Sequence, residues 1–310
     1  MQSQTHSPAA GIAFMILGMF LISVNDMLIK GVSGNYPLHE VVLIRSLIGL
    51  CFTLVFMKLE GGLHLMRTSR PGLHLLRAAL VVTANSAFYA AIVVMPLATA
   101  TAIYFVAPMF ITLLSVPVLG ETVGLRRIAA VLVGFSGVIV AMWSQLSFGV
   151  GWLALLPVVA AAGYAGMSVL TRRLGGGASA STLAFYIQLA FVIVSLAFYL
   201  VAGDGRFIHA GSSPSLFFLL RPWVWPDPAD LPVLIGLGLM SAVVGYSMSQ
   251  AYRLARASAV APFEYVLLVF ALFWGWIVFD EWPAPTVFAG AAIIIASGAY
   301  IFMREERRRR

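Results

Sequence analysis

The sequence predicts an all-α integral membrane protein of ten transmembrane helices, arranged as two inverted halves of five helices each. Three observations support this fold class: an unusually apolar composition, a succession of long apolar segments, and small-residue motifs that occur once in each half. Hydrophobic residues form 61% of the 310 residues and charged residues 10%, with a mean hydropathy of +0.96. Roughly a quarter of an ordinary globular chain is charged, so a soluble domain could not bury this much apolar surface.

The apolar segments have the length of membrane spans. A transmembrane helix needs about 20 apolar residues to cross the hydrocarbon core of a bilayer. We expect the spans at residues 11–30, 38–57, 74–95, 97–119, 126–143, 151–171, 181–202, 231–252, 257–279 and 284–303. Two connections are longer than the others. The connection 58–73 is basic, and 203–230 is rich in Phe and Trp, which is typical of a segment in the membrane interface or of an ordinary surface loop.

The distribution of Lys and Arg predicts that both termini are cytoplasmic. Cytoplasmic loops carry an excess of these residues. With the N-terminus inside, fifteen lie in inner segments, three (Lys30, Arg206 and Arg221) in outer loops, and Arg45 within a span. The inner residues are Lys58, Arg67, Arg70, Arg77, Arg126, Arg127, Arg172, Arg173, Arg253, Arg256, Arg304 and Arg307 to Arg310. The basic tail 304–310 is expected to contact anionic lipid, so the net charge of +7 does not require a nucleic acid partner.

Motifs of the first half recur in the second half in the same order. The matched pairs are Tyr89 with Tyr246, Leu97–Ala102 with Leu254–Ala259, Gly120-Glu121 with Asp280-Glu281, and Phe135–Val138 with Ala296–Ala299. They predict two repeats, 11–143 and 151–303, followed by the tail 304–310. Because each repeat has five spans, the second enters the membrane from the opposite side. Inverted repeats around a midplane site are a recurrent transporter architecture.

These motifs resemble those of the drug/metabolite transporter superfamily, specifically its ten-helix EamA-type members. The resemblance covers about 11–303 and is carried by the stretch Arg45–Gly49, the small-residue run that ends in Pro108, and Gly120-Glu121 with their weaker counterparts. It implies cofactor-free secondary carriers of amino acids, nucleotide-like metabolites or drugs in the bacterial inner membrane. Within the superfamily, the chain resembles amino-acid exporters of the YddG type. The chain departs from the pattern at Asp280, which replaces Gly, and at Pro262, which lies earlier in its span than Pro108.

Ionisable side chains inside the spans are costly and therefore candidates for function. Asp26 lies about four residues from the outer end of the first span, and Arg45 about eight residues into the second span from the same side. They are expected to form a structural ion pair or an outer gate. Glu264 lies inside the ninth span with no basic residue within a turn of that helix. It is a candidate for binding a substrate amine or a coupling proton, and a structural role stays open.

Polar and aromatic side chains within other spans predict a cavity wall, because small-molecule sites combine aromatic surface with a few hydrogen-bonding groups. Asn85 and Tyr89, and likewise Tyr246 and Gln250, are four residues apart and share a helix face. The residues expected to bind substrate are Asn85, Tyr89, Tyr104, Tyr164, Tyr246, Gln250 and Glu264. Packing between helices is the competing role for each. Pro108, Pro157 and Pro262 are expected to act as hinges.

The sequence argues against an enzyme. Gly134–Gly137 matches the G-x-S-G of intramembrane serine proteases, but that chemistry needs a histidine base on a nearby helix, and the later spans contain none. No zinc-binding H-E-x-x-H or ATP-binding P-loop is present, so we expect neither a metal nor a cofactor. The expected function is export of amino acids by alternating access. A carrier of another metabolite or drug, a passive channel and a scramblase stay open, and the oligomeric state is compatible with a monomer.

Overall fold

The computed structural model describes residues 8–68, 70–120, 124–147, 151–174, 180–209, 211–254 and 261–309, and every regular element in these ranges is a helix. Seven helices there are long and apolar enough to cross a membrane, and three shorter apolar helices cover 128–144, 263–279 and 285–301. The predicted all-helical membrane fold is therefore confirmed. The count of ten spans and the orientation of the termini stay predictions.

The helices follow the predicted spans closely. In chain order the α-helices are α1 (Pro8–Val32), α2 (Leu38–Glu60), α3 (Pro71–Ile92), α4 (Leu97–Tyr104), α5 (Ala107–Leu119), α6 (Leu125–Ser147), α7 (Leu156–Leu174), α8 (Ala180–Ala202), α9 (Pro214–Leu220), α10 (Leu231–Leu254), α12 (Val266–Phe279) and α13 (Pro285–Arg309). Short 3-10 helices are η1 (Leu63–Met66), η2 (Gly151–Leu155) and η4 (Ala261–Tyr265). The sequence did not predict η1 and α9, which lie in the two long connections.

Three predicted spans are discontinuous, and a proline lies at each discontinuity. The span 97–119 divides into α4 and α5, with Pro108 in the first turn of α5. Pro157 lies in the first turn of α7, directly after η2. Pro262 lies in η4, directly before α12. The first turn of a helix tolerates proline because its N–H groups have no partner within the helix. A hinge role for these prolines stays a prediction.

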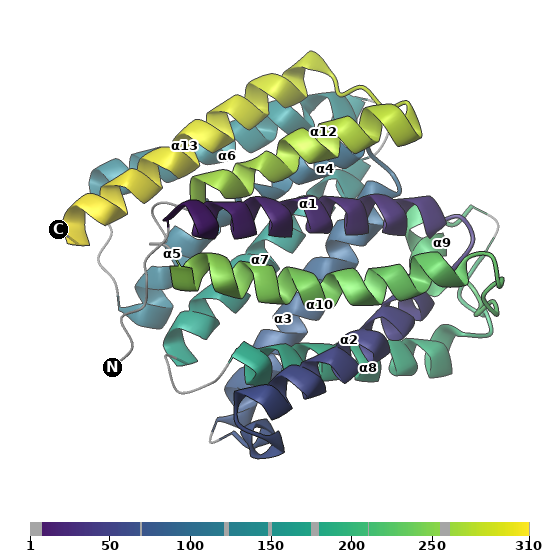
Figure 1. Cartoon of the computed structure of the whole chain (residues 1–310). Coiled ribbons are helices and arrows are strands. Elements are labelled where there is room, and N and C mark those ends of the chain that lie inside the picture. Colours follow the sequence, from purple (N-terminus) through teal and green to yellow (C-terminus); the bar gives the residue numbers. More distant parts are fainter. Residues whose placement is uncertain are drawn as a thin grey trace. The chain divides into compact units, whose positions relative to one another are not determined.

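The chain forms two compact units that cut across the two halves of the sequence. The first unit contains Met1–Met27, Met95–Ala154 and Val243–Arg310, and the second unit contains Leu28–Val94 and Leu155–Ala242. Each unit thus takes helices from both predicted repeats. In the first unit α6 packs along α13 and α4 packs against α12, and in the second unit α2 packs along α8 and α3 along α7 (Figure 1).

Small residues allow close contact between helices inside each unit. In the first unit, a Cβ added to Gly290 of α13 would lie 2.5 Å from the carbonyl oxygen of Gly137 and 2.6 Å from the Cβ of Ala141, both on α6. In the second unit, a Cβ on Gly163 of α7 would lie 2.9 Å from the carbonyl oxygen of Leu80 on α3. Small residues are enriched where membrane helices touch, because they let the backbones approach.

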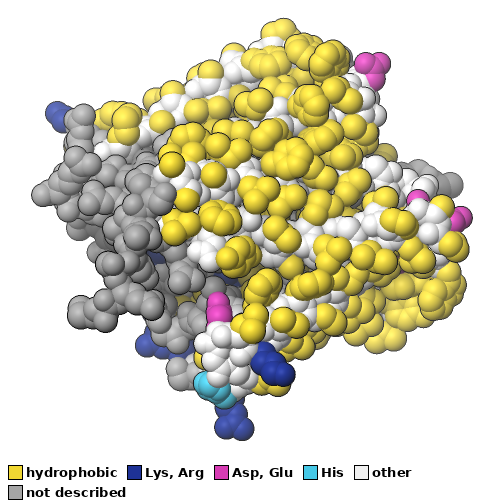
Figure 2. Space-filling model, in the orientation of Figure 1, with side chains coloured by type: hydrophobic (Ala, Val, Ile, Leu, Met, Phe, Trp, Pro, Cys, Tyr) yellow, Lys and Arg dark blue, Asp and Glu magenta, His cyan; other side chains and the backbone are white. Residues whose placement is uncertain are grey.

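Apolar side chains cover the outer faces of the helices. Only 11% of the apolar stretch of α8 is buried. Figure 2 shows apolar side chains over most of the helix faces in view, with few charged side chains among them. Monomeric soluble proteins rarely expose apolar patches larger than a few hundred Å², so these faces fit contact with lipid.

The repeated motif Gly120-Glu121 and Asp280-Glu281 marks two equivalent helix ends. Gly120 ends α5 with φ 71° and ψ 20°, and Asp280 ends α12 with φ 52° and ψ 35°. Both residues have the left-handed conformation that favours glycine, so the departure at Asp280 leaves the backbone geometry of the motif intact. The next residue, Glu281, accepts a hydrogen bond at 3.1 Å from the N–H of Leu97 and so caps the start of α4. Its counterpart Glu121 lies outside the described residues.

The contact between α6 and α13 predicts that Gly290→Ala destabilises the protein. The added methyl group overlaps the backbone of α6, which typically costs about 1–3 kcal/mol. Thermal unfolding in detergent measures the change. The control is Gly245→Ala, where no atom lies within 4 Å of the added Cβ and the lower backbone entropy of the unfolded chain is expected to raise stability by about 0.5–1 kcal/mol. Equal effects of the two substitutions would contradict close packing at Gly290.

The left-handed helix ends predict opposite effects of two substitutions. Asp280→Gly removes the steric strain of a side chain at positive φ and is expected to stabilise the protein by roughly 0.5–1 kcal/mol. Gly120→Ala introduces that strain and is expected to destabilise it by about 1 kcal/mol, although the added Cβ meets no atom within 4 Å. Unfolding curves of the two variants and the parent measure both changes. A stabilising Gly120→Ala would rule out the left-handed geometry.

Candidate functional site

A buried arginine is the centre of the candidate site in the second unit. Arg45 of α2 is 6% exposed, and its Nη1 donates a hydrogen bond at 3.0 Å to the hydroxyl of Tyr89 on α3. Its guanidinium carbon lies 5.7 Å from the ring centroid of Tyr89 and 5.3 Å from that of Phe191 on α8. Three helices thus hold one cation between two aromatic rings.

The guanidinium keeps unused hydrogen-bonding capacity. Among the described residues, the buried Nε of Arg45 has no hydrogen-bond partner, and neither has the buried hydroxyl of its neighbour Ser46. Aromatic faces attract a cation and partly offset the cost of removing it from water. They do not replace a hydrogen-bond acceptor, and a charged side chain inside a membrane protein is expected to line a pathway or bind a charged group. The geometry therefore suits an incoming acceptor such as a carboxylate or a ring carbonyl.

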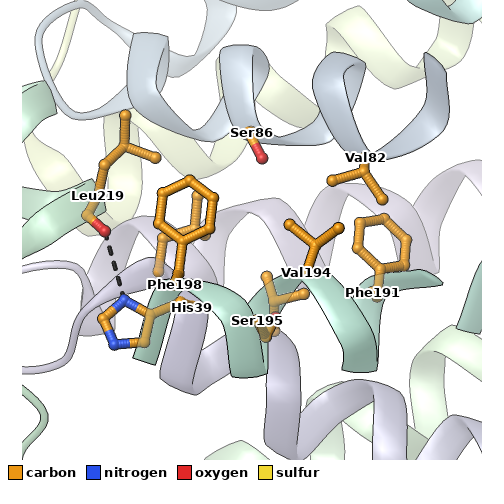
Figure 3. Close-up of a pocket in the computed structure, with 10 residues that line it drawn as sticks. His39, Val82, Ser86, Phe191, Val194, Ser195, Phe198 and Leu219 are labelled. Atoms are coloured by element: carbon orange, nitrogen blue, oxygen red, sulfur yellow. Dashed lines mark hydrogen bonds between the residues drawn. The ribbon is translucent and has the colours of Figure 1, made fainter. Parts of the chain in front are cut away.

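A small cavity lies next to this arginine, and Phe191 contributes to both. Its lining combines residues of α3, α8 and α9 with His39 at the start of α2 (Figure 3). The polar groups of the lining are His39, Ser86 and Ser195. The cavity has space for water but not for a metabolite.

Sequence reasoning missed several of these lining residues, although their spacing carried a signal. Val82, Ser86 and Tyr89 are four and three residues apart on α3, and Phe191, Ser195 and Phe198 have the same spacing on α8. Residues with this spacing share one helix face. In an almost wholly apolar span, however, a lone Ser or Phe looks the same as a packing residue. His39 was not singled out because it lies at the edge of a span.

The predicted site residues of the second unit have different surroundings. Tyr89 binds Arg45, as described above. Asn85 donates a hydrogen bond at 3.0 Å to the carbonyl oxygen of Val81 on its own helix. Tyr164 of α7 is half-buried, and Pro157 is buried. A substrate-binding role for Asn85 and Tyr164 stays a prediction.

The other predicted site residues belong to the first unit. Asp26 is buried in α1, and its expected pairing with Arg45 of the second unit stays a prediction. Tyr104 packs against Phe105 with ring centroids 6.5 Å apart, and Tyr246 is 45% exposed with its ring edge-on to Phe14. The remaining candidates are Gln250 and Glu264, both half-buried, Pro108 at the start of α5, and Pro262 in η4.

The first unit also contains a polar contact that the sequence did not predict. The indole N–H of Trp274 on α12 donates a hydrogen bond at 3.1 Å to the hydroxyl of Ser23 on α1. Phe20 lies against both Phe270 and Trp274, with ring centroids 5.4 and 6.2 Å apart. Over the described ranges, no group of three or more His, Cys, Asp or Glu is placed to hold a metal ion.

The chain is similar to known membrane transporters. Residues 9–143 match the EamA-like transporter family. The chain is 32% identical over 261 residues, 84% of its length and 79% of the relative's, to a riboflavin transporter of Rhizobium johnstonii. It is 25% identical over 298 residues, 96% of its length and 94% of the relative's, to an S-adenosylmethionine uptake transporter of Rickettsia prowazekii. A solved crystal structure with 18% identity shares the fold, with a TM-score of 0.62 over 99% of this chain and 100% of that one.

The hydrogen bond between Arg45 and Tyr89 predicts a stability loss in Tyr89→Phe. The substitution removes the acceptor of a buried charged donor, and hydrogen bonds to charged groups contribute about 1.5–3 kcal/mol. Thermal unfolding of the purified protein measures the loss. Tyr199→Phe is the matched control, because Tyr199 is exposed on α8 and only its ring contacts Trp223. If Tyr89→Phe is as stable as Tyr199→Phe, the hydroxyl of Tyr89 does not hold Arg45.

Proposed function

Since the chain belongs to the EamA-like transporter family of the drug/metabolite transporter superfamily, we propose that it is a secondary carrier that moves a small metabolite with a flat ring by alternating access. Membership of the family makes it a multi-pass transporter of the bacterial inner membrane and not an enzyme. The proposal adds the substrate class and the mode of transport.

The observation that carries the proposal is the buried guanidinium of Arg45 between the rings of Tyr89 and Phe191, with its Nε unpartnered among the described residues. A planar guanidinium donates to carboxylates and carbonyl groups in a fixed geometry, and the adjacent aromatic faces suit a flat ring. Riboflavin and S-adenosylmethionine, the substrates named for two relatives, both combine a flat heteroaromatic ring with acceptor groups.

An exported amino acid is the second candidate. Its carboxylate would pair with Arg45, because guanidinium–carboxylate pairs combine charge with two parallel hydrogen bonds. The single charge of Arg45 fits one carboxylate. This candidate lacks a relative among those described above, so we place it after the heteroaromatic metabolite.

The proposed mechanism uses ten helices in two inverted halves of five, with both termini cytoplasmic. Arg45 would alternate between Asp26 and the substrate, and the helix discontinuities at Pro108, Pro157 and Pro262 would absorb the movement. Asn85, Tyr104, Tyr164, Tyr246, Gln250 and Glu264 would line the path. Support comes from the excess of Lys and Arg in the segments assigned to the cytoplasm and from the location of each proline at a helix break.

Transport by purified protein in liposomes tests the proposal. We expect saturable uptake of labelled riboflavin or a related heteroaromatic metabolite, competed by the unlabelled compound. Arg45→Gln keeps the approximate size of the side chain but removes its charge, and is expected to lower the transport rate at least about tenfold, the loss expected for one charge-assisted hydrogen bond.

Arg206→Gln is the matched control, because Arg206 is exposed and pairs with Asp204 at 3.0 Å in the loop after α8. It is expected to transport like the parent. Saturable flux of amino acids without flux of heteroaromatic metabolites would move the assignment to the second candidate. Full activity of a correctly folded Arg45→Gln would remove Arg45 from the substrate site.

A further inference from the structure

One segment of the second unit borders the cavity beside Arg45. We define the strap as residues 213–230, which include α9. The hydroxyl of Ser215 donates a hydrogen bond at 2.6 Å to the carbonyl oxygen of Ala90 on α3. Phe218 is 1% exposed, and Leu219 lines the cavity (Figure 3). The strap is therefore packed onto the ends of the helices that form the cavity.

Side chains at the start of α2 hold the strap at three places along its length. Nδ1 of His39 lies 3.3 Å from the carbonyl oxygen of Leu219 and donates to it. Oε2 of Glu40 accepts from the N–H of Val224 at 3.2 Å. The hydroxyl of Tyr36 accepts from the N–H of Asp227 at 3.0 Å and donates to Oδ2 of Asp230 at 2.6 Å.

The carboxyl group of Glu40 is unusual among these contacts because it is fully enclosed. Its exposed fraction is 0%, and its Oε1 has no hydrogen-bond partner among the described residues. A buried charge without sufficient partners is unfavourable, whereas a neutral carboxylic acid tolerates such a place far better. The single backbone donor of Val224 can bond to either form. The closed strap therefore favours the protonated acid.

The charged and titratable groups around Glu40 leave this carboxyl without a direct counter-ion. The positive charge of Arg221 in the strap acts on Glu40, but Arg221 donates to the carbonyl oxygen of Gly34 and forms no ion pair with Glu40 within the described part of the chain. The hydrogen bond to Asp230 raises the pKa of Tyr36 above its usual range, so this phenol stays protonated near neutrality. From α8, Tyr199 contacts Trp223 of the strap.

His39 is the other titratable group under the strap, and its protonation would have the opposite effect on the strap. Its Nε2 is buried without a hydrogen-bond partner among the described residues. Protonation of His39 would place an unsatisfied charge under the strap and open it at low pH. Ionisation of Glu40 would open it at high pH. The direction of the pH dependence therefore separates the two groups.

We propose that Glu40 is a proton-binding site of the carrier, over which the strap closes when the carboxyl group is neutral and from which it lifts when the proton leaves for water. The role of this site in transport rests on the proposed carrier function, whereas the binding of the proton does not. Opening would expose the cavity beside Arg45 and Phe191. The proton would thus be a second ligand of the protein, bound at the end of the second unit where α2 begins.

Cysteine labelling of the full-length protein without substrate tests the proposal. The free Cys51 is exposed, so it is first replaced by Ser. Ser195→Cys then reports on the cavity lining, and Arg206→Cys, at an exposed position, corrects for the reactivity of thiols at each pH. The ratio of their maleimide labelling rates is measured between pH 5.5 and 8.5. We expect this ratio to rise about tenfold with pH. That is the change in the population of the open strap if its proton affinity differs tenfold from that of the closed strap.

Substitutions identify the responsible group. Glu40→Gln, which imitates the neutral acid, is expected to keep the ratio low and independent of pH. Asp204→Asn removes an exposed carboxyl group and is expected to leave the rise intact. A rise that persists in Glu40→Gln, a constant ratio in the parent, or a ratio that falls with pH would each overturn the proposal. Transport is not part of this readout, so the carrier function can fail or succeed independently.

If Glu40→Gln does not fold, a measurement on the parent protein still tests the proposal. Hydrogen–deuterium exchange of a peptide spanning 213–225 is followed in the parent protein at the same pH values and corrected for the intrinsic rate. The amide of Val224 is expected to lose protection as the pH rises. Unchanged protection across this range would also overturn the proposal.

Discussion

Hydrocarbon offers no hydrogen bonds, so each backbone N–H and C=O inside a bilayer must find its partner within the protein. This constraint explains why the described elements are helices and why the helix breaks are short. At the break between α4 and α5, the N–H of Val106 bonds to the carbonyl oxygen of Ile103 at 3.1 Å and that of Met109 to Val106 at 2.9 Å. At the start of α4, the carboxylate of Glu281 supplies the acceptor that no helical residue can supply to Leu97.

The same constraint explains the location of polar side chains in the second unit. Arg45 is tolerated because Tyr89 and Phe191 surround it, and Arg77 because it donates to the hydroxyl of Thr171 at 2.6 Å and to the carbonyl oxygen of Leu183 at 3.0 Å. Among the described residues, the buried atoms left without a hydrogen-bond partner include Nε of Arg45 and Oε1 of Glu40.

The sequence predicted what depends on local pattern. Apolar length placed the ends of α8 within one residue and those of α2 within three, and the Gly120 and Asp280 motifs each lie at a helix end. It did not predict α9, because seven residues among prolines carry too short a pattern for a helix. It did not pair Arg45 with Tyr89, which is 44 residues away in the chain, and the expected pairing of Arg45 with Asp26 stays a prediction. Such pairings depend on how helices pack, and apolar spans with few distinctive residues give little indication of their neighbours.

The division of the chain into two units has a consequence for biosynthesis. The first unit combines Met1–Met27 with Val243–Arg310, and α13 provides the main contact surface for α6. During translation, every residue of the second unit has been made once residue 242 has been added. The first unit is complete only after the last helices have been made. Until then α6 lacks α13, whose Gly290 and Ile293 lie against Gly137 of α6. The earliest helix of the chain thus reaches its final surroundings only when the latest ones arrive.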